Sequence, residues 1–114
     1  MGLNKKQVEF SGDLAKLLTY AFESGQPVIV SEVFRTKEQA QWYKDRGLGI
    51  LNSAHRLKLA ADLYRVVDGK VSWDVDEYRD LARYWKALRP ENRAGIDFTR
   101  RDAVHFSREH NGVS

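Results

Sequence analysis

The 114-residue sequence contains no cysteine. Disulfide bonds and thiolate metal ligands are therefore excluded, and any metal ion must be held by histidine, aspartate, glutamate or backbone groups. The lack of cysteine does not by itself identify the redox compartment.

Long apolar runs are also absent. No segment approaches the roughly 20 apolar residues that a helix needs to cross a bilayer. The first residues, MGLNKKQVEF, lack the apolar core of a secretory signal. We therefore expect a protein that is made in the cytoplasm and has no stable membrane association.

The remaining composition is that of an ordinary globular protein, with 42% hydrophobic and 31% charged residues. The length predicts one domain over residues 1–114. A formal net charge of +3 favours an anionic polymer as partner, either nucleic acid or bacterial cell wall, and charge alone does not choose between them. Because the basic residues are scattered among acidic ones, with Arg100-Arg101 as the only arginine pair, we interpret them as a solvated surface.

The first half of the chain predicts helix, strand, helix and loop. Apolar residues recur at helical spacing over residues 5–24, and the β-branched and aromatic run 27–34 predicts a buried strand. Thr36 and Gln39 form a capping box for a helix over 37–44, with Trp42 and Tyr43 expected to pack onto the core. The glycine-containing segment 45–52 predicts a mobile loop without the spacing of a phosphate-binding motif.

The second half predicts a hairpin and one more helix. Asp68-Gly69 is a two-residue turn signal between strands at 59–67 and 70–73. Asp74 and Glu77 cap a helix over 75–88 whose aromatic face belongs to the core, and Arg89-Pro90 ends it. A loop over 92–97, short extended pieces near 97–98 and 104–106, and a fraying tail over 107–114 complete an α+β domain, a short antiparallel sheet flanked by helices.

Three side chains stand out as metal ligands. The stretch NSAHRLKLAADL places His55 seven residues before Asp62, and His105 follows in a later segment. Imidazole and carboxylate are good zinc ligands, and catalytic zinc keeps three protein ligands with one open position. Asp62 lies among apolar residues and needs a partner when buried; a salt bridge to an arginine is the alternative to zinc. His110, in the polar tail, is predicted to face solvent.

The spacing of the first two ligands restricts the backbone between them. Seven residues apart on a helix, they would share a face but lie about 10 Å apart along the axis. In one straight strand they would point to opposite faces about 23 Å apart. We therefore predict a bend around residues 56–58, with His55 before it and Asp62 on the strand that follows.

The pattern Ser-x-His with Asp seven residues after the His, then Asp-x-x-His near the C-terminus, resembles the M15 zinc peptidases of peptidoglycan. The resemblance extends through Ser31-Glu32-Val33-Phe34-Arg35-Thr36, Asn52-Ser53-Ala54-His55, Tyr84-Trp85 and Asp97-Phe98. Two departures stand out: Lys58 replaces a common glycine, and Ala94-Gly95-Ile96-Asp97 replaces a more usual Trp-Gly-Gly-Asp. Neither changes a predicted ligand, although both bear on the substrate cleft.

The resemblance implies a Hedgehog/DD-peptidase-like fold, one Zn²⁺ per chain on His55, Asp62 and His105, and a role for each of three more residues. Asp102 matches the general base that later acts as acid toward the leaving amine. Arg35 and Ser53 match substrate-binding positions. Spacing alone, without the resemblance, favours a different interpretation of two of them: Asp102 as a turn residue after Arg100-Arg101, and Arg35 as a surface arginine at the end of a strand.

The implied function is hydrolysis of peptidoglycan peptide stems. The short length and the segments above look most like the phage L-alanyl-D-glutamate endopeptidases, which predicts a monomeric phage or prophage endolysin acting on the cell wall after release. A D-alanyl-D-alanine carboxypeptidase of the same family is the first alternative. The second is a non-enzymatic module that binds cell wall or nucleic acid; we expect no nucleic-acid partner.

Overall fold

Antiparallel strand pairing brings distant parts of the chain together. The computed structural model describes residues 2–114. Four strands pair in the order β1-β2-β5-β4, β3 pairs with β2, and every pairing is antiparallel. Their bounds are β1 (Val28–Val30), β2 (Ala60–Val67), β3 (Lys70–Val71), β4 (Asn92–Ala94) and β5 (His105–Arg108).

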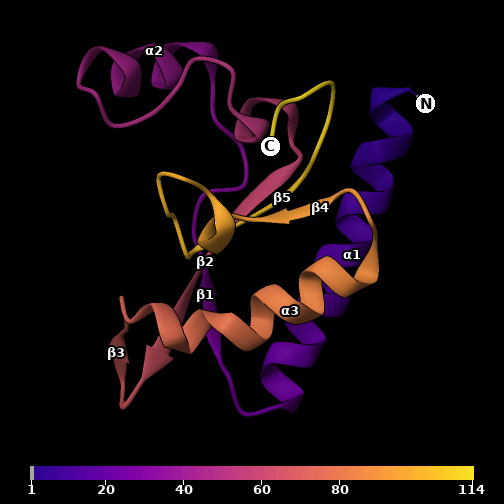
Figure 1. Cartoon of the computed structure of the whole chain (residues 1–114), viewed down its shortest axis with the longest axis vertical. Helices are drawn as coiled ribbons and strands as arrows, with labels where there is room; N and C mark the ends of the chain where they lie inside the picture. Colours follow the sequence, from indigo (N-terminus) through magenta and orange to yellow (C-terminus); the bar gives the residue numbers. More distant parts are fainter. Residues whose placement is uncertain (1) are drawn as a thin grey trace.

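Helices cover the sheet unevenly. The α-helices are α1 (Leu3–Glu23), α2 (Lys37–Asp45) and α3 (Arg79–Leu88), and the 3-10 helices are η1 (Ala54–Leu57), η2 (Val75–Tyr78) and η3 (Gly95–Asp97). Figure 1 shows α1 and α3 crossing beside one another, whereas α2 lies away from both. This confirms the predicted α+β class. Within the described residues, no helix is both long and apolar enough to cross a membrane.

Trp85 on α3 connects the helices to the sheet. Its side chain is fully buried and meets the Phe10 ring of α1 edge-on, with ring centroids 5.6 Å apart. Its indole nitrogen donates to the carbonyl oxygens of Arg93 (3.0 Å) and Ser107 (3.1 Å), on β4 and β5. The strand that begins with His105 therefore rests on a satisfied, close-packed core.

Several elements form where the sequence predicts them, because their signals are local. Thr36 and Gln39 make the reciprocal capping box of α2. Asp68 and Gly69 both have positive φ, +52° and +76°, and join β2 to β3 in the two-residue turn that this dipeptide favours. The helix predicted over 75–88 begins as the 3-10 helix η2 and continues as α3.

The predictions of a buried strand over 27–34 and of a core position for Trp42 are wrong. The strand predicted over 27–34 is only Val28–Val30, and Ile29 and Val30 are half-exposed because β1 is an edge strand. Trp42 is also half-exposed, with the Arg46 guanidinium 3.8 Å from its ring centroid. Ala40, not Trp42, is the buried residue of α2.

The C-terminal part is more regular than predicted. Residues 92–97, predicted as loop, form β4 and η3, and the extended piece near 97–98 is the end of η3. The tail begins as a strand: Ser107 and Arg108 are buried in β5, paired with β2 and β4. These elements depend on partners far away in sequence, which supply the burial that their own residues do not signal.

Candidate metal centre and active site

The strand register places two of the predicted ligands side by side. Asp62 on β2 is directly opposite His105 on β5. His55 reaches the same place from η1, because the chain reverses at Lys58, whose φ of +56° is left-handed. The predicted bend is therefore present, and it removes the separation that a straight strand would impose.

The nitrogen and oxygen atoms of these side chains converge. His55 Nε2 lies 3.2 Å and His105 Nδ1 lies 3.6 Å from Asp62 Oδ1. One ligand atom from each residue lies within 4.8 Å of the other two. Tetrahedral zinc with bonds of about 2.0–2.1 Å separates neighbouring ligand atoms by roughly 3.3 Å, so the spacing fits that ion.

Hydrogen bonding within the cluster is incomplete. Asp62 Oδ1 is buried and makes no hydrogen bond of sound geometry within the described residues, although it faces two imidazole nitrogens. Leaving a buried carboxylate oxygen without a partner is costly. A cation shared among the three side chains would satisfy it, and the predicted alternative, an arginine salt bridge to Asp62, is not formed within residues 2–114.

Electrostatics keeps Asp62 ionised. Burial raises its pKa and is the largest single influence, but the ring nitrogens of His105 and His55 that face the carboxylate, and the charge of these rings, together outweigh burial and lower the pKa to about 2. Asp62 is therefore a carboxylate at neutral pH, as a zinc ligand must be.

Glu32 is a residue that the sequence interpretation missed. Its Oε1 accepts from Arg35 Nε (2.9 Å) and Nη2 (2.6 Å), and lies 3.5 Å from His55 Nδ1. Metal-binding histidines usually donate their second N–H to a carboxylate or carbonyl. No spacing rule links Glu32 to His55; the link comes from pairing across the sheet, where Asp62 N donates to the Glu32 carbonyl oxygen at 2.8 Å.

Arg35 and Ser53 border the site, each with a structural contact of its own. The Arg35 guanidinium is bound by Glu32 and lies over the Tyr43 ring, 4.6 Å from its centroid. The Ser53 hydroxyl accepts from His55 N at 3.2 Å and so caps η1. Substrate binding by either residue stays a prediction.

Asp102 lies in the same cavity, on the turn before β5. Its carbonyl oxygen accepts from His105 N at 3.1 Å, and its own N–H donates to the Gly95 carbonyl oxygen at 2.9 Å. Burial, followed by the negative charge of Asp62, raises the pKa of the Asp102 carboxyl. A carboxyl with a raised pKa beside a metal site has the properties of a general acid or base.

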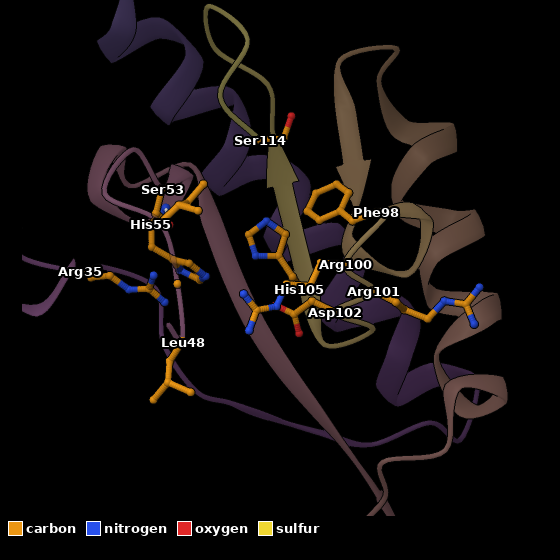
Figure 2. A pocket seen from close by; sticks show the side chains of 12 residues that line it. Arg35, Leu48, Ser53, His55, Phe98, Arg100, Arg101, Asp102, His105 and Ser114 are labelled. Atoms are coloured by element: carbon orange, nitrogen blue, oxygen red, sulfur yellow. Dashed lines mark hydrogen bonds between the residues drawn. The ribbon is translucent and has the colours of Figure 1, made fainter. Parts of the chain in front are cut away.

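Figure 2 shows the cavity that these side chains surround. Its volume is about 430 Å³, and Arg35, Ser53, His55, Asp102 and His105 all line it. The structure thus brings together the residues predicted from sequence, with Asp62 between the two histidines. His110 is outside the cluster; its Nδ1 lies 2.9 Å from Lys6 Nζ.

Solved structures place this fold in a known class. The chain has the VanY-like fold of the M15 zinc peptidases, as the sequence resemblance implies. It is similar to the Serratia marcescens L-Ala D-Glu endopeptidase ChiX, with 26% identity and a TM-score of 0.72 over 86% of this chain and 79% of that one.

A second similar structure contains the metal. The vancomycin-resistance D,D-pentapeptidase VanY, a mutant from a VanB-type resistance cassette in complex with Zn(II), shows 22% identity and a TM-score of 0.61 over 89% of this chain and 71% of that one. The sequence alone matches no family profile and no curated protein. His55, Asp62 and His105 give this chain a group able to hold the same ion.

Proposed function

We propose that this protein is a zinc peptidase that hydrolyses the peptide stem of bacterial peptidoglycan at the L-Ala–D-Glu bond. The observation that carries the proposal is the convergence of His55, Asp62 and His105 in a cavity that Asp102 also lines. The ChiX likeness supports this bond, because it is the stronger of the two in both identity and TM-score.

Hydrolysis of a peptide bond needs a polarised carbonyl, a proton acceptor and an oriented substrate, and the site offers a group for each. Zinc, when bound, supplies Lewis-acid polarisation of the scissile carbonyl and lowers the pKa of water. Asp102, which lines the same cavity as both histidines, takes the proton from the attacking water and returns it to the leaving amine. Arg35 and Ser53 orient the stem peptide from the cavity wall.

Release of C-terminal D-alanine is the second candidate, and the VanY likeness is the observation that favours it. The role of a phage or prophage endolysin, made in the host cytoplasm and acting on the wall after release, rests on the resemblance of short segments to phage-type endopeptidases.

Mass spectrometry of products separates these candidates. Zinc-loaded protein is incubated with purified peptidoglycan and the fragments are analysed. The proposal expects stem peptides with a new N-terminal D-Glu. Free D-Ala would instead establish the carboxypeptidase activity. Binding to the wall without any cleavage, after zinc has been added, would indicate a non-enzymatic module.

A further inference from the structure

Two guanidinium groups at the cavity, those of Arg100 and Arg101, have no role in the chemistry above. Arg35, Arg100 and Arg101 all border the cavity. Figure 2 shows the side chain of Arg100 directed toward the space beside Asp102 and His105, whereas Arg101 extends away from it. Arg101 Nε donates to the Ile96 carbonyl oxygen at 3.0 Å, which holds that side chain outward.

Arg35 is already paired. Two of its nitrogens donate to the same Glu32 oxygen, and the Tyr43 ring covers one face of its guanidinium. The charge of Arg35 is therefore largely compensated before any substrate arrives.

Arg100 retains its charge and most of its donors. Within residues 2–114, it forms no ion pair, and its one hydrogen bond runs from Nη2 to the Gly47 carbonyl oxygen at 3.0 Å. That bond connects the turn before β5 to the loop 46–53 and holds the side chain beside the cavity that it lines. Nε, Nη1 and the second hydrogen of Nη2 remain free to donate, so one edge of the guanidinium, formed by Nη2 with one of its neighbours, can still bind a carboxylate in a two-bond arrangement.

We propose that Arg100 binds the free carboxylate of the D-Glu residue that follows the scissile bond, and so makes the protein selective for stems in which this carboxylate is not amidated. The inference rests on the proposed function. In the stem the chain continues through the side-chain carboxyl of D-Glu, so its α-carboxylate is a free anion close to the bond being cut. The hydrogen bond to the Gly47 carbonyl oxygen already restricts the Arg100 side chain, which lowers the conformational entropy that binding costs.

Two stem peptides that differ only in D-Glu or D-isoglutamine test the inference. kcat/KM is measured for the wild type, Arg100→Gln and Arg101→Gln. A charge-assisted hydrogen-bonded pair predicts that the wild type prefers the carboxylate peptide by about ten-fold or more. Arg100→Gln should bring the ratio toward one, mainly through KM, while Arg101→Gln should keep the wild-type ratio.

A binding measurement separates this inference from the proposed function. Calorimetry of the zinc-free protein with both peptides reports binding without turnover, and the wild type should bind the carboxylate peptide more tightly. Cleavage of both peptides without preference, or an unchanged ratio in Arg100→Gln, overturns the inference and leaves the function standing. If neither peptide is bound or cleaved, both fail.

Discussion

Glu32 lies beside the ring nitrogen of His55 that does not face Asp62, and so bears on which nitrogen of His55 can bind a metal. If His55 Nε2 binds the ion, its proton must lie on Nδ1, and the carboxylate oxygen that faces Nδ1 is Glu32 Oε1, 3.5 Å away. Arg35 in turn holds Glu32. The arginine predicted to bind substrate thus also supports the metal site through one shared carboxylate.

Replacing Glu32 should therefore weaken zinc binding without removing a ligand. We expect Glu32→Ala to lower zinc affinity about 10- to 100-fold, the usual effect of losing an outer partner of a metal-bound histidine. Glu32→Gln, whose amide oxygen still accepts a hydrogen bond, should lose less zinc affinity. Competition with a chelator measures the zinc affinity of both variants. The control is Glu38→Ala, which removes an exposed glutamate. Unchanged affinity in Glu32→Ala would refute the link.

Asp102 should be needed for turnover but not for metal. Asp102→Asn keeps the shape of the side chain and removes the proton acceptor, so we expect wild-type zinc content and a loss of at least about 100-fold in kcat. Zinc analysis and stem hydrolysis on the same preparation check this. Hydrolysis at the wild-type rate would exclude the base role.

At the scale of the element, η3 fixes the turn that carries Asp102. A Cβ atom on Gly95 would lie 2.1 Å from the Asp102 carbonyl oxygen and 2.8 Å from His105 Cβ. Glycine is therefore required here by close approach, not by its φ angle.

Gly95→Ala should accordingly destabilise the protein and disturb the metal site together. We expect a loss of about 1–3 kcal/mol in the free energy of unfolding, measured with urea on zinc-free protein, and weaker zinc binding. Gly12→Ala is the matched control, because no atom lies within 4 Å of its Cβ position inside α1. Alanine there should stabilise by about 0.5–1 kcal/mol. A neutral Gly95→Ala would contradict the packing argument.

Asp80 links α3 to α1. It accepts hydrogen bonds from the Tyr20 hydroxyl, from Arg83 and from Gln26 Nε2 at 2.8 Å. These bonds, with Tyr20 contributing most, lower the pKa of Asp80 from 3.8 to about 2. Since the folded-state pKa is below the unfolded one, this contribution to stability is complete above about pH 4 and is lost as the pH falls toward 2.

Asp80→Asn should consequently show a pH-dependent cost. The variant should unfold at lower urea concentration than the wild type at pH 7, and the difference should shrink as the pH approaches 2. Asp76→Asn, which removes an exposed pair with Arg79, should have little effect at either pH. A difference that stays constant between pH 7 and pH 2 would show that the charge of Asp80 is not responsible.

At the scale of the whole molecule, the predictable features are those with local signals. The capping box at Thr36 and the Asp68-Gly69 turn are each specified within a few residues, whereas the bend after His55 was predicted from the spacing of two proposed ligands. The grouping of His55, Asp62 and His105 was predicted from residue chemistry and family resemblance, and the β2–β5 register accounts for it.

The features that could not be predicted from the sequence depend on which distant segments pack against each other in the fold. β4 has no strand pattern of its own and forms because β5 pairs with it and Trp85 bonds to the Arg93 carbonyl oxygen. The exposure of Val30 depends on β1 being an edge strand. Glu32 enters the site only through the β1–β2 side of the sheet, so no spacing along the chain could identify it.

The central claim is that one zinc ion is held by side chains from both halves of the chain, and metal analysis of purified protein tests it most directly. We predict about one zinc per chain in the wild type and in His110→Ala, whose histidine lies outside the cluster. His55→Ala and His105→Ala should each lose the metal while remaining folded. Full zinc content in either ligand variant, or none in the wild type after zinc is supplied, would contradict the account.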